Sequence, residues 1–342
     1  MILEAPRLWS PDDPYLYRFT VSAGGDFVRS YFAVRTINVR TIDGISRICL
    51  NGEPVFFNGL LDQGYWSDGL MTPASPSCFT DDIVKLKEIG FNTLRKHIKV
   101  EPDIFYYECD RLGMFVFQDM VNNGDYSFLR DTILPTVGRL SRDDTKKLPS
   151  PEIMERFKCA MLETAEHLEG HPSIVLWTIF NEGWGQFSGS EMYALLKAAD
   201  PSRLIDTASG WFAGCDTDIE SRHVYFRKVK VLQEPTAKPY LVTEFGGYSW
   251  RPEGHCFNLS GNYGYGSYKS RDALVNAVRA LYHGQVLPLV GKGLCGTVYT
   301  QVSDVEDETN GIFSYDRRVQ KILPEEIWEI FDKIQKAVTG TL

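Results

Sequence analysis

Residues 173–180 read Ser-Ile-Val-Leu-Trp-Thr-Ile-Phe, an apolar run followed directly by Asn181, Glu182 and Gly183. Residues 240–243 read Tyr-Leu-Val-Thr and are followed by Glu244. Each run has the length and composition of a buried strand. A carboxylate at the tip of a buried strand is costly to desolvate, so such a residue is usually kept for chemistry. The two runs therefore predict two functional acids at strand ends.

Strand-like and helix-like segments alternate from about residue 40 onward. This alternation indicates a parallel sheet, and eight such units over this length fit a (β/α)8 TIM barrel of the α/β class. The predicted helices cover residues 81–89, 102–112, 151–169, 270–286 and 324–338. The predicted strands cover residues 54–59, 91–95, 114–117, 173–182, 204–208, 222–225, 240–244 and 296–300.

Residues 1–39 follow a different pattern. Residues 16–21 and 31–35 alternate polar and apolar side chains on either side of a Gly-rich turn, which predicts an antiparallel hairpin. Two strands do not form a stable domain alone. We therefore expect two domains: residues 1–39, a partial β-sandwich remnant packed against the barrel, and residues 40–342, the barrel.

Composition excludes several classes of protein. The chain has 342 residues, a net charge of -9 and a pI near 5.3, with no basic stripe of a nucleic-acid binder. Its 7 cysteines are scattered without a Cys-x-x-Cys pair, which argues against a disulfide framework and a zinc site. No apolar run approaches the roughly 18 residues of a membrane span. We expect no cofactor and no dedicated metal site, although a cation held by tip carboxylates stays open.

The cellular location is also open. The first residues lack a basic segment followed by an apolar one, so no signal peptide is expected, and cytoplasmic, periplasmic and secreted locations all remain.

The positions of the two acids indicate glycoside hydrolysis. Residues at the C-terminal tips of barrel strands converge on one face, and strands 4 and 7 lie on opposite walls. Glu182 and Glu244 would then face each other across a bound sugar, as one proton donor and one nucleophile. A single Glu at a strand end can instead form a structural ion pair, but two together with Asn181 favour catalysis.

Other polar residues at strand ends are candidates for substrate binding. Asn181 could hydrogen-bond a sugar 2-hydroxyl, and Arg95 could orient the nucleophile. His223 and Tyr225 could add hydrogen bonds to that carboxylate. For each of these a purely structural role is the alternative. The remaining candidates are His97, Asp62, Asp119, Trp184, Trp211 and Tyr299.

Two further segments carry expectations. Residues 121–150 form a long polar stretch that suits a lid or a wall of the site. Glu306, Asp307 and Glu308 are expected to form a solvated acidic loop.

These motifs resemble glycoside hydrolase family 2, which includes β-galactosidases, β-glucuronidases and β-mannosidases. The resemblance implies a retaining exo-β-glycosidase with Glu182 as acid/base and Glu244 as nucleophile. Relative to that family, we expect these residues to include only the tail of the immunoglobulin-like domain, without the N-terminal jelly-roll domain. The segments that carry the resemblance are residues 8–17, 47–59, 91–97, 177–185, 242–247 and 310–318.

The resemblance also bears on the substrate. The β-glucuronidases carry an Asn-x-Lys pair, but here Asn310 is followed two positions later by Ile312, which argues against glucuronate. Tyr299 stands where a Trp is often found, and His97 follows Arg95 by two positions rather than three. A β-galactosidase-like enzyme acting on a carbohydrate is the first choice, and a homo-oligomer stays open.

Three alternatives remain. One is another β-glycosidase, such as a β-mannosidase. Another is a carbohydrate-binding barrel that lacks turnover because the N-terminal domain is missing. A barrel lyase or aldolase would need a Schiff-base lysine, and the nearby Lys96 and Lys99 are expected to be solvated or to face outward.

Overall fold

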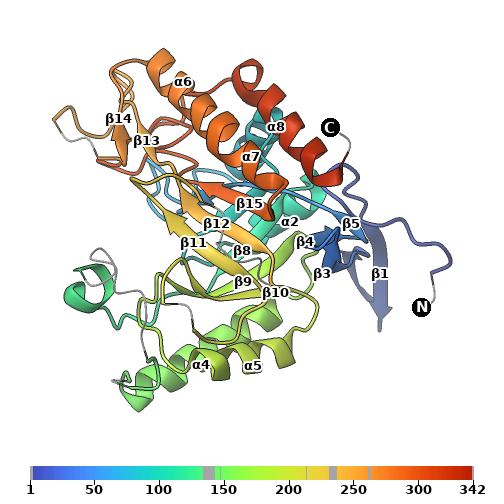
Figure 1. Cartoon of the computed structure of the whole chain (residues 1–342). Coiled ribbons are helices and arrows are strands. Elements are labelled where there is room, and N and C mark those ends of the chain that lie inside the picture. Colours follow the sequence, from blue (N-terminus) through green and yellow to red (C-terminus); the bar gives the residue numbers. More distant parts are fainter. Residues whose placement is uncertain are drawn as a thin grey trace.

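The computed structural model describes residues 3–133, 143–146, 148–212, 214–230, 237–260 and 263–340. An eight-stranded parallel sheet curves into a nearly closed barrel, with the order β10-β9-β8-β7-β6-β15-β12-β11 (Figure 1). The predicted TIM barrel is thus confirmed. The barrel strands are β6 (Phe57–Asp62), β7 (Thr93–Lys96), β8 (Phe115–Asp119), β9 (Ile174–Asn181), β10 (Leu204–Ser209), β11 (Glu220–Val224), β12 (Tyr240–Phe245) and β15 (Leu294–Tyr299).

Helices cover the outside of the barrel (Figure 1). The last helix buries residues at i, i+3 and i+4 spacing in the hydrophobic core, including Ile327, Ile330 and Phe331. Ser150 caps helix α4 and accepts a hydrogen bond from the Ile153 amide. The helical segments are α1 (Ser77–Ile89), α2 (Asp103–Leu112), η1 (Leu129–Ile133), α4 (Pro151–His167), α5 (Gly189–Ala199), α6 (Arg271–Leu281), η2 (Tyr282–Val286), α7 (Leu287–Val290) and α8 (Pro324–Thr339).

Three elements differ from the sequence expectation. The first barrel strand begins at Phe57 rather than Pro54, because β5 (Glu53–Pro54) instead pairs antiparallel with the preceding strand. The predicted helix 270–286 ends at Leu281 and continues as the π-helix η2. Helix α5 lies between barrel strands β9 and β10, where the sequence pattern predicted no helix.

Side chains close the gap between the first and last strands of the sheet order. No strand pairing joins β10 to β11 in the described part of the chain. Instead, Ser221 Oγ donates to Asp206 Oδ1 at 2.9 Å and accepts from the Gly210 amide at 3.2 Å. The Asp218 amide donates to the Ile205 carbonyl. Polar side chains and this backbone hydrogen bond together complete the barrel at this seam.

The N-terminal segment packs against the barrel through Trp9, whereas most residues of its first hairpin are exposed. The predicted hairpin is present as β1 (Tyr17–Ala23) and β2 (Asp26–Phe32). Trp9 is completely buried, its indole N–H donates to the Asp110 carbonyl at 2.8 Å, and its ring meets Phe115 edge-on. This segment therefore shares a hydrophobic core with the barrel interior.

A second hairpin follows, formed by β3 (Ile37–Ile42) and β4 (Ile45–Leu50). The boundary predicted at residue 39 falls inside β3. The division into a sandwich remnant and a barrel stays a prediction.

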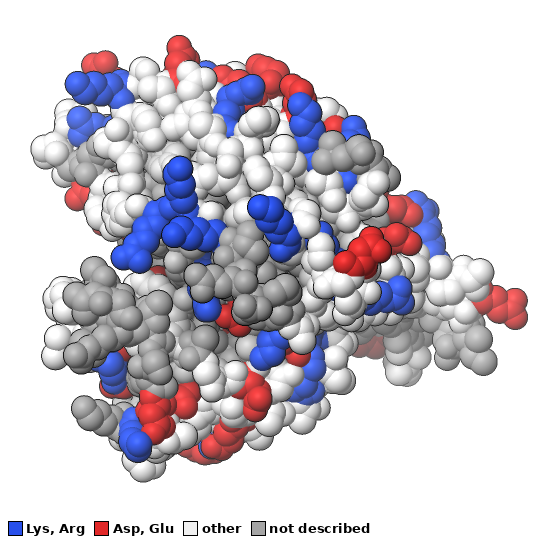
Figure 2. Space-filling model, viewed as in Figure 1, with Lys and Arg blue, Asp and Glu red and all other residues white. Residues whose placement is uncertain are grey.

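Two expectations bear on the described part of the chain, namely the lack of a membrane-spanning helix and the lack of a basic stripe. None of the described helices is long and apolar enough to cross a membrane. Among the described residues on the face in Figure 2, acidic and basic side chains are interspersed, apart from one small group of Lys and Arg. This face therefore lacks the extended basic stripe expected of a nucleic-acid binder.

Candidate active site

The barrel brings Glu182 and Glu244 together with His223. Glu182 follows the last residue of β9 and has a left-handed φ of 51°. Its backbone amide donates to the Ser209 carbonyl on β10. The next residue, Gly183, has a φ of 67°, and a Cβ there would lie 2.2 Å from the Phe212 ring. Glycine is therefore required where the chain turns away from the strand and leaves Glu182 facing the site.

The two carboxylates lie close enough for a retaining mechanism. His223 Nδ1 lies 2.9 Å from Glu182 Oε1 and 3.4 Å from Glu244 Oε2. One oxygen of each carboxylate and a ring nitrogen of His223 lie within 4.8 Å of one another. Retaining glycosidases hold their carboxyl groups about 5–5.5 Å apart, whereas inverting enzymes need about 6.5–9.5 Å. The observed spacing matches the shorter class.

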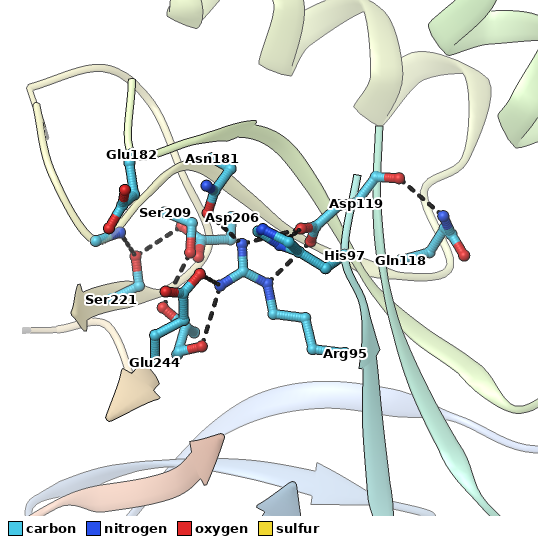
Figure 3. Close-up of polar contacts among 12 residues, drawn as sticks. Arg95, His97, Gln118, Asp119, Asn181, Glu182, Asp206, Ser209, Ser221 and Glu244 are labelled. Atoms are coloured by element: carbon cyan, nitrogen blue, oxygen red, sulfur yellow. Dashed lines mark hydrogen bonds and ion pairs between the residues drawn. The ribbon is translucent and has the colours of Figure 1, made fainter. Parts of the chain in front are cut away.

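Arg95 lies at the centre of the polar contacts in Figure 3 and is completely buried. Its Nη1 donates to Glu244 Oε1 and to the Thr243 carbonyl, both at 3.0 Å. Its Nη2 donates to Asn181 Oδ1 at 2.8 Å, and Nε and Nη2 form a bidentate pair with Asp119. One guanidinium on β7 therefore binds groups on β8, β9 and β12.

The two glutamates sit in different environments. Burial raises the pKa of Glu182 to about 7, although the charges of His97 and Arg95 oppose the rise. Glu244 instead accepts hydrogen bonds from Arg95 and from the Tyr225 hydroxyl, the latter at 2.8 Å. These donors stabilise negative charge on Glu244. Glu182 thus suits a proton donor and Glu244 a nucleophile.

His223 links the two acids as a neutral group. Burial lowers its pKa to about 3, and the nearby Glu244 charge only partly offsets this. Because Arg95 Nη1 can only donate, the 3.2 Å contact makes His223 Nε2 the acceptor. We infer from this network that the proton lies on Nδ1 and is donated to Glu182.

His97 and Asp119 lie beside the acids. His97 Nδ1 contacts Asp119 Oδ2 at 3.1 Å. Burial alone would raise the pKa of Asp119, but Arg95 and His97 outweigh it, so the pKa is lowered. Asp119 therefore serves as a buried counter-ion for Arg95 and as a hydrogen-bond partner of His97.

The two predicted tryptophans lie at the rim of the site and are half-buried. Trp211 lies with its ring centre 6.5 Å from that of His223. The Trp184 ring meets Tyr126 edge-on at 5.5 Å. The Trp184 indole nitrogen is buried without a hydrogen-bond partner in the described part of the chain.

Two predicted contacts lie outside the pocket. Tyr299 packs in the hydrophobic core against Phe245 and Tyr282, and its hydroxyl accepts from the Tyr248 amide. The residue at that strand tip is Thr300, whose hydroxyl bonds the Tyr225 hydroxyl at 2.7 Å. Tyr299 is thus a packing residue, because it directs its ring toward the helices.

Asp62 belongs to a buried ion-pair network. Lys96 Nζ lies 2.7 Å from Asp62 and from Glu101, and it is completely buried. The expectation that Lys96 is solvated or faces outward is therefore wrong. Lys99 also pairs with Glu101 and binds the Gly64 carbonyl. Two carboxylates hold Lys96 as an ammonium, which does not favour a Schiff base.

Glu308 is a residue that the sequence analysis placed wrongly. Glu306 and Asp307 are exposed as expected, but Glu308 is half-buried. Its Oε2 accepts from Gln301 at 2.7 Å and from Gln63 at 3.1 Å. No sequence periodicity marks these residues, because they come from two loops far apart in the chain.

Other polar features complete the description. Asp206, which was not predicted as a site residue, is buried on β10, and burial raises its pKa to about 6.

The segment 121–150 contains η1. Residues 134–142 and 147 lie outside the described residues, so the role of this segment as a lid or wall stays a prediction. Glu182, His223 and Glu244 could also hold a cation by their spacing. Arg95 already supplies positive charge to Glu244.

Comparison with known proteins gives a consistent picture. Residues 41–252 match the family model described as glycosyl hydrolases family 2, TIM barrel domain. A β-galactosidase of Aeromonas hydrophila subsp. hydrophila is 30% identical over 223 residues, covering 62% of this chain and 19% of that protein. A putative β-glucuronidase of Formosa agariphila is 26% identical over 260 residues, covering 74% and 23%.

Solved structures share the fold. A β-D-glucuronidase of Dictyoglomus thermophilum superposes with a TM-score of 0.72 at 16% identity, over 97% of this chain and 60% of that one. A β-galacturonidase of Eisenbergiella tayi, bound to galacturonate, has a TM-score of 0.69 at 20% identity, over 97% and 60%. The chain spans about a fifth of the curated relatives it matches. By its family match, the chain belongs to glycosyl hydrolase family 2, in the part that forms the TIM barrel domain.

Proposed function

We propose that this chain is the catalytic barrel of a retaining exo-β-glycosidase, with Glu182 as acid/base and Glu244 as nucleophile. The observation that carries the proposal is the pair of carboxylates bridged by neutral His223 at retaining distance, in environments that separate their roles. Two carboxylates with one proton between them are what double displacement needs.

The first step transfers the sugar to the protein. Glu244 Oε2 or Oε1 attacks the anomeric carbon while the bond to the leaving oxygen breaks, and Glu182 gives its proton to that oxygen. Arg95 holds Glu244 in place, and Tyr225 donates to its Oε2. In the second step Glu182 takes a proton from water, the hydroxide attacks the anomeric carbon, and Glu244 is released.

The sugar is most consistent with a β-galactoside. The β-galactosidase of Aeromonas hydrophila is 30% identical over the matched region. Ile312 is 2% exposed in the hydrophobic core, so the position two residues after Asn310 supplies no cation for a sugar carboxylate. A β-mannoside is the alternative within the family.

Aryl β-glycosides test this proposal. We expect Glu244→Ala to abolish turnover of every substrate, and azide to restore it with formation of the α-glycosyl azide. Glu182→Ala should retain turnover of dinitrophenyl glycosides, which need no proton donor, and azide should give the β-glycosyl azide. The sugar that the unmodified chain hydrolyses fastest identifies the glycone.

The same experiment separates turnover from binding alone. A folded chain that binds sugars but hydrolyses none, with and without the azide, would contradict the proposal and favour a carbohydrate-binding barrel. A 2-deoxy-2-fluoro glycoside tests the nucleophile directly. Its covalent glycosyl intermediate should be recovered on the peptide that contains Glu244.

A further inference from the structure

Glu308 is held at the mouth of the barrel by two amide side chains. Its Oε2 accepts from Gln301, which follows the tip of β15, and from Gln63, which follows the tip of β6. Gln63 also donates to Gln301 Oε1 at 2.7 Å. The other oxygen, Oε1, has no hydrogen-bond partner among the residues that the structure describes. One oxygen is therefore fixed, and the other is available.

The loop that carries Glu308 is rigid. Asp304 and Lys321 form a completely buried ion pair at 2.6 Å. Lys321 Nζ also binds the Thr309 carbonyl, and Asp304 Oδ1 accepts from the Gly311 amide. The backbones of Val305 and Glu308 exchange two hydrogen bonds. The position of the Glu308 carboxylate is therefore set before any sugar binds.

The carboxylate lies on the wall opposite the proton donor. In the sheet order, β15 is four strands from β9, so the two lie across the barrel from each other. Its partners Gln301 and Gln63 follow the C-terminal tips of β15 and β6, so Glu308 lies at the same end of the barrel as Glu182 and Glu244. Since Glu182 must touch the leaving oxygen, the leaving group lies on the β9 side. The body of the sugar then extends toward Gln63, Gln301 and Glu308.

A carboxylate at this point distinguishes neutral sugars from acidic ones. Its free oxygen can accept a hydrogen bond from a sugar hydroxyl. A sugar carboxylate would instead meet a like charge at short range. The cations on this wall, Lys96 and Lys99, are already paired with Glu101, and Lys96 also with Asp62. A sugar acid would therefore find no free counter-ion among the described residues of this wall.

We propose that Glu308 is a specificity-determining residue that accepts a hydrogen bond from an uncharged glycone and excludes sugar acids. This inference rests on the proposed function, since it concerns the sugar held between Glu182 and Glu244. It contrasts with the solved structures described above as a β-galacturonidase and a β-glucuronidase, whose names imply acidic glycones.

The test compares two substrates that differ only at C5. We expect nitrophenyl β-galactoside to exceed nitrophenyl β-galacturonide in kcat/KM by at least about 100-fold with the unmodified chain. Glu308→Gln keeps the shape and removes the charge, and it should shrink that ratio by at least about tenfold. Asp307→Asn is the matched control, because it removes an exposed charge from the same turn and should leave the ratio unchanged.

The outcomes separate the two proposals. Turnover with a ratio unchanged in Glu308→Gln, or with galacturonide preferred, overturns the specificity role and leaves the glycosidase standing. If neither substrate turns over, tryptophan fluorescence is titrated with galactose and with galacturonate. Selective binding of galactose that Glu308→Gln weakens supports the role of Glu308 while the catalytic proposal fails. Equal binding, or none, overturns it. Glu308→Ala serves as a second variant that removes the carboxylate. Thermal melts of Glu308→Gln and Glu308→Ala check that both variants are folded.

Discussion

At the scale of single residues, the site depends on protonation of one buried glutamate. Burial raises the pKa of Glu182 to about 7, from an ordinary value near 4.5. Because the first step needs the acid form, we expect kcat/KM to fall as pH rises through about 7. A pH profile with a nitrophenyl glycoside and with a dinitrophenyl glycoside measures this. The basic limb should weaken with the dinitrophenyl substrate, and equal limbs would contradict the assignment.

The same pKa affects stability with a definite sign. The folded chain binds the Glu182 proton more tightly than the unfolded chain, so this contribution to stability is present below about pH 4.5 and is lost as pH rises through about 7. Glu182→Gln removes the cost of the buried charge. We expect the variant to gain up to about 3 kcal/mol relative to the unmodified chain at pH 8 but not at pH 4. Urea unfolding at the two pH values measures the difference, and a gain that is independent of pH would contradict it.

Arg95 is the residue on which four strands depend. Arg95→Lys keeps a positive charge but cannot bind Asp119, Glu244 and Asn181 together. We expect the free energy of unfolding to fall by about 3–5 kcal/mol and kcat to fall by at least about 100-fold. Exposed Arg18→Lys is the control. Normal kcat in a folded Arg95→Lys chain would show that its geometry is not needed.

At the scale of elements, the seam between β10 and β11 is the place where side chains replace a strand ladder. Ser221→Ala leaves Asp206 Oδ1 without its Ser221 partner and frees the Gly210 amide. We expect Ser221→Ala to lower the free energy of unfolding by about 1–3 kcal/mol. In this variant, amide hydrogen exchange should be faster in residues 204–210 and 220–224 than in the other barrel strands. Ser22→Ala on the exposed hairpin is the control. Uniform exchange would indicate that backbone contacts alone hold the seam.

The elements also explain which predictions could be made from sequence. Long apolar runs such as 173–180 predict buried strands because nearly every residue must leave water. The start of the first barrel strand was predicted too early, at Pro54. A Pro can lie in a short edge pairing, which local composition does not reveal. The burial of Glu308 and of Lys96 was not predicted, because it depends on partners from distant segments, namely Gln63 for Glu308 and Asp62 for Lys96.

At the scale of the whole molecule, the N-terminal segment acts as part of the barrel's core. Trp9 is buried in the same cluster as Phe57 and Phe115. We expect Trp9→Ala to cost about 3–5 kcal/mol and to lower the melting temperature of the entire chain in one transition. Leu8→Ala, at a residue 40% exposed, is the control. A separate early transition would mean instead that the segment unfolds on its own.

The barrel, the two acids at strand ends and the family resemblance could all be predicted from the order of residues along the chain. Hydrophobic periodicity and short motifs are local properties, and parallel strands necessarily bring their C-terminal tips to one face. Only the tertiary structure decided how the acids differ, because burial and the approach of Arg95, His223 and Tyr225 set their environments. The same holds for Tyr299, whose ring faces the helices, and for Glu308, which Gln63 and Gln301 draw into the mouth. Desolvation and charge pairing depend on distances in space, which separation along the chain does not supply.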